Sequence, residues 1–204
     1  MVLGATGLTG RILVNQALRE GHQVKAIVRD SKKLVVKSEL LQIQVADILN
    51  ERQLTTELIN QDVVLSTLGT GRNLHSDIIS RVMPVLIASM YNAKIKRLIF
   101  LSSFGVGETI KDASLFSKVI FKLFLNDILK DKHKADELLK QSTLDYTLVY
   151  PTRLTNERQR GQFKVGEKIP LPFSPKISRE DVAAFMLDQV KENRWIRKTV
   201  VISD

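Results

Sequence analysis

The chain has 204 residues, no cysteine, and 31 basic against 22 acidic residues, which gives a formal net charge of +9. This length suits a single compact domain, and its 44% hydrophobic and 26% charged residues exclude a wholly disordered chain, a collagen and a disulfide scaffold. The apolar runs are far shorter than the roughly 20 residues that a bilayer crossing needs, and the chain does not open with a secretion signal. We therefore expect a cytoplasmic protein without a membrane segment.

Short β-branched runs alternate with longer amphipathic stretches along the first three quarters of the chain. This pattern predicts strands at 2–3, 24–28, 43–46, 63–66, 98–101 and 146–149. It predicts helices from residue 8 and at 51–60, 74–93 and 113–141. Apolar strands between helices are typical of a parallel sheet covered on both faces, so we expect a doubly wound α/β fold. The first strand is short against the usual five or six residues, which is consistent with an incomplete N-terminus.

The alternation of predicted strands and helices stops after Pro151. Residues 158–168 are basic and rich in turn formers, and prolines at 170, 172 and 175 interrupt regular structure. We expect this segment to be a short excursion on the substrate side. Residues 178–181 have the form of a helix start, and a last strand is predicted at 200–202. Since no repeat or linker marks a second domain, residues 1–204 should form one unit.

A glycine-rich loop joins the first predicted strand to the first predicted helix. Gly4 can make the tight turn, Gly7 lets backbone amides approach a pyrophosphate, and Gly10 allows the helix to pack closely on the strand. The helix N-terminus attracts negative charge, and neighbouring hydroxyls add donors. The pattern favours dinucleotide binding over an ordinary glycine turn. The predicted contacts are Gly4, Thr6, Gly7, Leu8, Thr9 and Gly10.

The second strand ends in Val28–Asp30, where a dinucleotide fold meets the adenosine ribose. Arg29 offers a planar donor fork to a 2′-phosphate, and Lys33 is a second cation. This favours NADP(H) over NAD(H). If the Asp30 side chain faced the ribose instead, the preference would be for NAD(H). A third alternative is that these charged residues form a solvated surface cluster without a role in binding.

Two further loops follow predicted strands at the edge where open α/β sheets bind ligands. Asp47 and Ile48 follow the third strand and are predicted to contact the adenine, although packing or helix capping would also explain them. Leu68 and Gly69 follow the fourth strand, where small residues let the chain pass close to the coenzyme. A plain loop would also use glycine here.

Several segments together resemble the atypical short-chain dehydrogenases, over nearly the whole chain. They are Gly4–Gly10, Val28–Asp30, Leu98–Ser103, Ser142–Thr147 and Ile177–Ala183. The chain is most similar to the NAD(P)H-binding, NmrA-like branch that includes the flavin reductase also known as biliverdin reductase B, with the closest local matches at 29–34 and 68–70. The resemblance implies a Rossmann fold, NADPH as hydride donor, and flavins, biliverdins or quinones as acceptors.

The usual short-chain dehydrogenase mechanism needs a tyrosine with a lysine four residues later on one helical face. Tyr91, Tyr146 and Tyr150 have no lysine at that spacing, so alcohol–ketone chemistry by that route is not expected. A conjugated acceptor such as a flavin can take hydride at one atom and spread the charge over its ring, with solvent supplying the proton. The protein would then contribute orientation and exclusion of water.

Residues at the ends of the fifth and sixth strands complete the predicted site. Ser103 matches the family's active-site serine position, and Ser102 is expected to contact the coenzyme, although a strand-end cap would also place serine here. Pro151 and Thr152 are further expected coenzyme contacts. Arg153 falls where the flavin reductase carries a histidine; it could bind a phosphate or carboxylate of the acceptor, or it could be a solvated surface residue.

Other side chains give weaker signals. An apolar wall of phenylalanines at 104, 116, 121 and 124 beside the nicotinamide is possible, but ordinary core packing is favoured. The three histidines are dispersed, so we expect no metal site. A coenzyme-binding sensor without catalysis is the alternative function, and nucleic-acid binding rests on charge alone. We expect a small-molecule acceptor and a monomer or weak homodimer.

Overall fold

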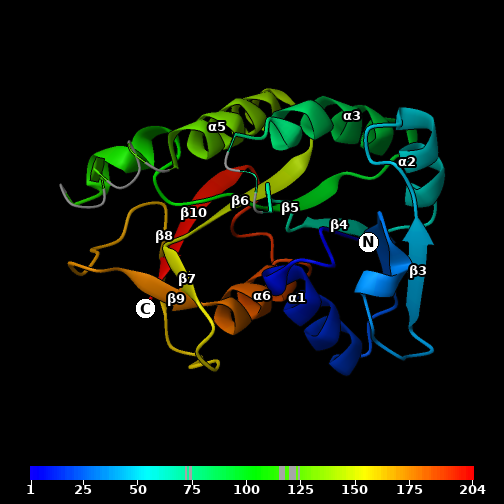
Figure 1. Ribbon diagram of the computed structural model, residues 1–204, viewed down its shortest axis with the longest axis horizontal. Coiled ribbons are helices and arrows are strands. Elements are labelled where there is room, and N and C mark those ends of the chain that lie inside the picture. Colours follow the sequence, from blue (N-terminus) through cyan, green and yellow to red (C-terminus); the bar gives the residue numbers. More distant parts are fainter. Residues whose placement is uncertain (72, 74, 115–117, 120–122, 124) are drawn as a thin grey trace.

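The computed structural model describes residues 1–71, 73, 75–114, 118–119, 123 and 125–204. A sheet runs between two layers of helices (Figure 1). Its strand order is β3-β2-β1-β4-β5-β6-β10-β8, and neighbouring strands are parallel except β8, which runs antiparallel to β10. The strands are β1 (Val2–Leu3), β2 (Val24–Val28), β3 (Leu41–Val45), β4 (Val63–Ser66), β5 (Arg97–Leu101), β6 (Asp145–Pro151), β8 (Lys164–Gly166) and β10 (Lys198–Ser203).

The helices cover both faces of this sheet, as the sequence predicts. One layer contains α2 (Glu51–Leu58), α3 (Ile78–Asn92) and α5 (Asn126–Gln141), and the other contains α1 (Leu8–Arg19) and α6 (Arg179–Asp188) (Figure 1). Short 3₁₀ helices lie at Ser31–Lys33 (η1) and Gly107–Asp112 (η2). The chain order reverses between β1 and β4, and open α/β sheets bind ligands at such a switch point. The doubly wound Rossmann-type architecture is therefore confirmed.

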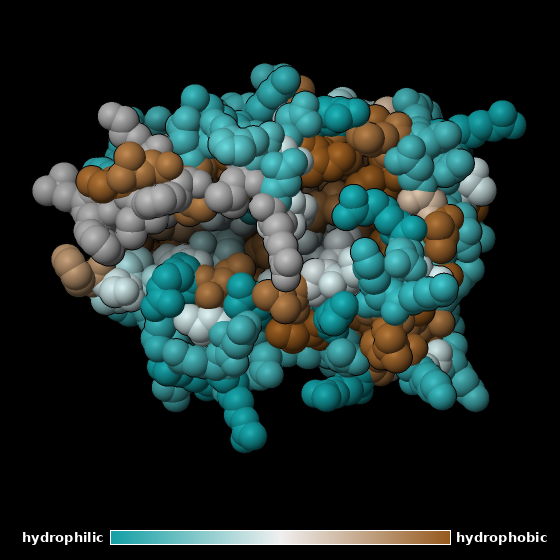
Figure 2. Space-filling view, in the orientation of Figure 1, coloured by the Kyte–Doolittle hydropathy of each residue, from teal (hydrophilic) through white to brown (hydrophobic). Residues whose placement is uncertain are grey.

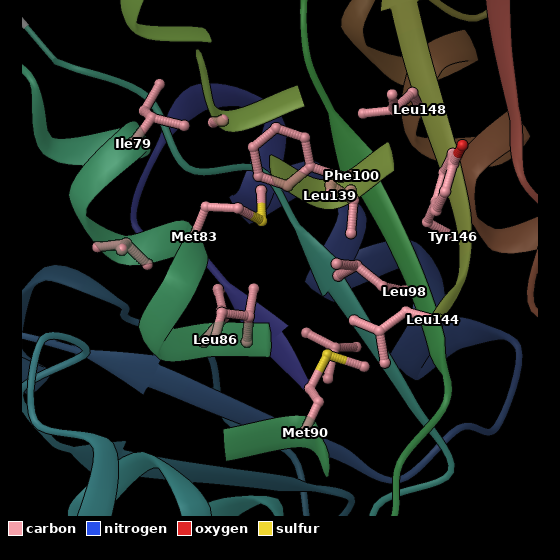
Figure 3. Packing of buried hydrophobic residues seen from close by; sticks show 14 of the residues in the cluster. Ile79, Met83, Leu86, Met90, Leu98, Phe100, Leu139, Leu144, Tyr146 and Leu148 are labelled. Carbon is pink, nitrogen blue, oxygen red and sulfur yellow. The ribbon is translucent and has the colours of Figure 1, made fainter. Parts of the chain in front are cut away.

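A large core cluster joins the α3 and α5 layer to the sheet (Figure 3). On α3, Ile79, Met83, Leu86 and Met90 repeat at spacings of four, three and four, which places them on one helical face. They pack against the apolar strand β5, where Phe100 is 1% exposed. A second cluster joins α1 and α6 to the opposite face. The two clusters fix the strand ends that carry the candidate site.

Most strands and helices lie where the alternating pattern predicts them, with shifted ends. The predicted helix at 74–93 begins only at Ile78, because the Asp131 carboxylate of α5 accepts the backbone N–H groups of Ile79 and Ser80 at 3.0 and 2.9 Å. Such a cap, supplied from a distant helix, leaves no local signature in the sequence. Of the helix predicted at 113–141, α5 occupies the part from Asn126 onward.

The excursion after Pro151 contains short strands that the sequence analysis missed. Strand β7 (Arg153–Thr155) pairs in parallel with β9 (Lys176–Ser178) as a separate two-stranded sheet, and β8 extends the main sheet. The turn at Arg160–Gly161 is tied to the start of α6, because the Asp181 carboxylate accepts both backbone N–H groups. The helix start predicted at Ser178 is confirmed, since its side chain caps α6.

No helix within the described part of the chain combines the length and apolar character needed to cross a bilayer.

Candidate coenzyme and acceptor site

The glycine loop between β1 and α1 is closed by the chain that follows β4. Gly4 has φ +78°, and a Cβ atom on it would lie 2.7 Å from the Thr67 carbonyl carbon. A Cβ atom on Gly10 would lie 2.2 Å from the Gly4 carbonyl oxygen. The Thr67 hydroxyl donates toward the carbonyl oxygens of Leu3 and Gly4, both at 3.2 Å. Tight backbone packing therefore explains glycine at positions 4 and 10, and Thr67 is a loop-positioning residue that the sequence analysis missed.

The N-terminus of α1 is open to a ligand. Its N-cap residue Gly7 supplies no side-chain hydrogen bond, and the first turn contains no acidic residue. Gly7 and Leu8 are exposed, Thr6 is partly buried and Thr9 is buried. The first N–H groups of a helix have no intrahelical partner and carry partial positive charge, so this end suits a pyrophosphate. The cradle that only glycine can form fits the predicted dinucleotide.

Side chains beyond β2 form a basic pocket beside α1. The Asp30 carboxylate accepts the backbone N–H of Lys32 at 3.1 Å and so caps η1, while the Arg29 side chain is exposed. The Arg11 guanidinium donates to the Lys33 carbonyl oxygen at 2.8 Å. A cavity of about 220 Å³ lies here, lined by Arg11, Asn15, Lys32, Lys33, Leu34, Val35 and Val36.

The sequence analysis did not predict Arg11 and Lys32 as residues of this pocket. Arg11 had a recognisable signal, because it follows the third glycine directly and lies in the first turn of α1. Its placement against Lys33 depends on the long-range packing of η1 beside α1, which local sequence patterns do not show.

The loops after β3 and β4 lie at the same edge of the sheet. Asp47 is exposed, and its carboxylate accepts the backbone N–H of Leu49 at 2.9 Å while Asn50 caps α2. Ile48 and Leu68 are partly buried against the core, and Gly69 is exposed with open space around its Cα. Asp47 thus stabilises a turn and keeps its second carboxylate oxygen available to a ligand.

A buried polar network lies where β5 and β6 end. The Ser102 hydroxyl and the Tyr150 hydroxyl both donate to Asp136 Oδ2, each at 2.6 Å. Asp136 is 0% exposed, and its Oδ1 atom has no partner among the described residues. Burial raises the pKa of Asp136 to about 6, although the two hydroxyls and Lys132 oppose that shift. Burial and the Asp136 charge raise the pKa of Tyr150 well above its ordinary value.

Lys132 of α5 reaches the same strand end. Its Nζ atom donates to the Ser102 carbonyl oxygen at 2.7 Å. Burial lowers the pKa of Lys132 to about 8, and the carboxylates of Asp136 and Asp131 oppose this shift. The residue four positions before Lys132 is Ile128 rather than a tyrosine, so the tyrosine–lysine spacing of the short-chain dehydrogenases does not identify this lysine. It is the main polar group of the site that the sequence analysis missed.

The two predicted serines have different environments. The Ser102 hydroxyl is buried and engaged by Asp136, so its side chain is directed into the protein. Ser103 is partly buried, and its hydroxyl donates to the Phe104 carbonyl oxygen at 3.2 Å. This single hydrogen bond, to the next residue along the chain, leaves the Ser103 oxygen free to accept one.

The segment after β6 separates buried from exposed groups. The Thr152 hydroxyl donates to Ser203 Oγ at 3.1 Å inside the sheet, and the Pro151 carbonyl accepts the Phe104 backbone N–H at 3.0 Å. Arg153 is exposed, and its guanidinium bonds to none of the described residues. The Arg153 side chain is therefore available to a ligand, whereas the Thr152 side chain is engaged.

The remaining aromatic and histidine predictions have mixed outcomes. Phe104 is 5% exposed and belongs to the core cluster, while Phe116, Phe121 and Phe124 lie outside the described residues. His75 is exposed and lies 2.6 Å from an Asp127 carboxylate oxygen.

In the view of Figure 2 the surface is hollowed between the two helical layers.

The doubly wound sheet and the glycine cradle at its switch point define a dinucleotide-binding α/β protein. Residues 4–193 match the sequence model of a family described as NAD(P)H-binding, and the chain belongs to this family. The match agrees with the resemblance to the atypical short-chain dehydrogenases and with an oxidoreductase-type fold.

Three known proteins illustrate the relationship. The photosystem II assembly factor Ycf39 of Synechocystis is 28% identical over 98% of this chain, which spans 60% of that relative's length. The oxidoreductase ylbE of Lactococcus lactis has a TM-score of 0.85 at 22% identity, covering 99% of this chain and 90% of that one. ChuY of Escherichia coli O157:H7, an anaerobilin reductase, has a TM-score of 0.81 at 20% identity, covering 98% and 94%. The two structures share the fold of this chain.

Proposed function

We propose that this protein is an NADPH-dependent reductase that transfers hydride to a conjugated acceptor such as a flavin, a biliverdin or a quinone. The observation that carries the proposal is the glycine cradle beside the open N-terminus of α1, in a chain of the NAD(P)H-binding family. ChuY, which has the same fold, is an anaerobilin reductase. These points support an oxidoreductase, and the site residues suggest the type of acceptor.

The basic pocket beside α1 supports a preference for NADP(H). Because Asp30 caps η1, its carboxylate is drawn toward the Lys32 backbone and the exposed Arg29 is left to meet the ribose. Arg11, Lys32 and Lys33 add positive charge around the 220 Å³ cavity. A 2′-phosphate in this cavity would gain charge-assisted hydrogen bonds, each worth about 1.5–3 kcal/mol, that NAD cannot make.

In this proposal the reaction does not use the tyrosine–lysine pair of the short-chain dehydrogenases, because none of the three tyrosines has a lysine four residues later. NADPH, when bound, supplies the hydride. In this proposal Ser103 hydrogen-bonds the nicotinamide or an acceptor carbonyl, and Arg153 binds a phosphate or carboxylate on the acceptor. The chain's contribution is to hold the two reactants in order and to exclude water, which favours an acceptor that delocalises charge.

A coenzyme-binding regulator without turnover is the second candidate function. It is favoured by the relative Ycf39, which is a photosystem II assembly factor. Within either candidate we propose a cytoplasmic monomer or weak homodimer that binds no specific nucleic acid. Size-exclusion chromatography with light scattering tests the oligomeric state.

An acceptor screen separates the two candidates. Purified protein would be mixed with NADPH and, in turn, FMN, riboflavin, biliverdin and a soluble quinone, while absorbance at the NADPH band is followed. A Gly10→Ala variant serves as the control for loss of the cradle. We expect turnover with at least one acceptor, which the variant lacks. Tight NADPH binding by calorimetry without turnover of any acceptor would establish the regulator instead.

A further inference from the structure

We propose that Lys132 donates the proton that neutralises the acceptor after hydride transfer, with the buried Asp136 as its counter-ion. The inference rests on the proposed reductase function. It adds a proton source to a site for which the sequence analysis named only solvent as able to supply the proton.

The first support is position. Lys132 Nζ is fixed on the Ser102 carbonyl, and Ser102 follows the last residue of β5 directly. The Ser102 backbone N–H in turn donates to the Val149 carbonyl of β6 at 2.9 Å, so the anchor is rigid. Gly4 and Thr67 follow β1 and β4 at the same edge of the parallel sheet. The amine is therefore held at the edge where the coenzyme and acceptor are expected to meet.

The second support is the number of free donors. An ammonium group has three N–H bonds, and the Ser102 carbonyl is the one hydrogen-bond acceptor of Lys132 Nζ among the described residues. Lys132 is partly buried as a residue, and burial of its ammonium group lowers its pKa, so the remaining N–H groups lie in a poorly hydrated environment. They can hydrogen-bond a carbonyl oxygen or ring nitrogen of a bound acceptor.

The third support is the arrangement of negative charge. Asp136 lies one turn further along α5, but both its hydrogen bonds come from Ser102 and Tyr150 hydroxyls. Asp131 on the same helix is engaged by backbone N–H groups of α3. Both carboxylates therefore favour the ammonium form without holding it in a direct ion pair. These two carboxylates are the charged groups that act on Lys132 Nζ in the described part of the chain, and the Tyr150 hydroxyl lies against Asp136.

The chemistry balances with these groups alone. NADPH, when bound, would supply hydride from its dihydronicotinamide ring and be left oxidised, so a C–H or N–H bond would form on the acceptor and negative charge would spread over its conjugated ring. An N–H bond of the Lys132 ammonium then breaks as an O–H or N–H bond forms on the acceptor. The neutral amine regains a proton from water. A lysine whose pKa lies near 8 is close to the operating pH, which favours such a donor.

Two substitutions at Lys132 test this role. Lys132→Arg keeps the positive charge, but a guanidinium does not release a proton near pH 8. Lys132→Gln removes both the positive charge and the transferable proton. The exposed neighbour Lys134 provides the matched control as Lys134→Gln. We expect both Lys132 variants to lose about 100-fold in kcat at saturating NADPH. Wild-type kcat should fall above a pH near 8, and neither Lys132 variant should show that step, whereas the Lys134 control should behave as wild type.

Two measurements do not depend on turnover. In protein labelled with ¹³C at the lysine ε-carbon, the signal that Lys132→Arg removes should titrate near pH 8, and Asp136→Asn should move that midpoint lower. Titration of NADPH fluorescence should give a dissociation constant for Lys132→Arg within threefold of wild type.

Three outcomes would overturn the inference. They are a Lys132 midpoint above 10, a Lys132→Arg variant that keeps its kcat and pH step, and a variant that loses coenzyme affinity but not kcat. In each of these the reductase function survives. A wild-type protein that binds NADPH and reduces no acceptor would overturn the proposed function and the inference together.

Discussion

The hydroxyl of Thr67 occupies the space beside Gly10: a Cβ atom on Gly10 would lie 2.7 Å from Thr67 Oγ1. The same hydroxyl donates to the Gly4 carbonyl oxygen. A loop after β4 thus sets the shape of the loop after β1, and the cradle depends on two strands that meet at the switch point of the sheet.

Gly10→Ala should disrupt this cradle. The added methyl group meets backbone atoms that cannot yield, so we expect a loss of about 1–3 kcal/mol in the free energy of unfolding, measured in urea. Calorimetry should show no NADPH binding. Gly69→Ala is the control for stability, because no atom of the described residues lies within 4 Å of its added Cβ atom. Equal stability of the two variants would contradict the packing argument.

Arg29→Ala and Arg11→Ala should reveal how the coenzyme is selected. Arg11 lines the basic pocket and Arg29 is exposed directly after β2, and each substitution removes a charged donor, so the NADPH dissociation constant should rise about 10- to 100-fold while that of NADH changes less than threefold. Arg19→Ala, at the other end of α1, is the matched control. If either pocket variant weakened both coenzymes equally, that arginine would have no role in reading the 2′-phosphate.

The adjacent serines should separate turnover from stability. Ser103→Ala is expected to lower kcat about tenfold and to leave coenzyme affinity unchanged, because its hydroxyl makes one weak hydrogen bond among the described residues. Ser102→Ala removes a buried donor from Asp136 and should cost about 1–3 kcal/mol in the free energy of unfolding. Steady-state kinetics and urea unfolding distinguish the two, and unchanged turnover in Ser103→Ala would remove that residue from the mechanism.

Asp136→Asn should change the pH dependence of stability. The folded-state pKa of about 6 exceeds the ordinary 3.8, so the folded protein binds this proton more tightly than the unfolded chain. The associated stability is present below pH 4 and is lost as pH rises through 6. Between pH 4 and 7 the wild type should therefore lose about 2–3 kcal/mol relative to the variant. Parallel urea titrations at several pH values measure this difference, and a constant difference would show that the carboxyl group is not perturbed.

Local chemistry made the coenzyme half of the molecule predictable. Helix α1 begins at Leu8 and β4 spans Val63–Ser66, as the glycine loop and the apolar run indicate. Lys132 and Asp136 were missed because their meeting with Ser102 depends on how α5 packs against the sheet. Neither residue belongs to a short motif, and in a basic sequence one more lysine on an amphipathic helix carries no special signal.

The excursion was harder to interpret for a related reason. Strand β8 has three residues, and its identity as a strand comes from pairing with β10 rather than from its own composition. In the same way, the Arg160–Gly161 turn is fixed by a carboxylate about twenty residues away in sequence. Short elements that are stabilised from outside themselves are poorly encoded by local periodicity.

The pairing of β7 with β9 and of β8 with β10 fixes the strands of the excursion after Pro151. The loops between these strands form a part of the chain that is distinct from the coenzyme-binding half. The span 167–175 begins and ends at a fixed strand and, unlike 156–163, does not contain the turn that Asp181 holds, so insertions or deletions within it should leave the NAD(P)H-binding half undisturbed. Relatives of this chain are therefore expected to accept larger or smaller oxidants through changes in loop length alone, while the coenzyme-binding half stays the same.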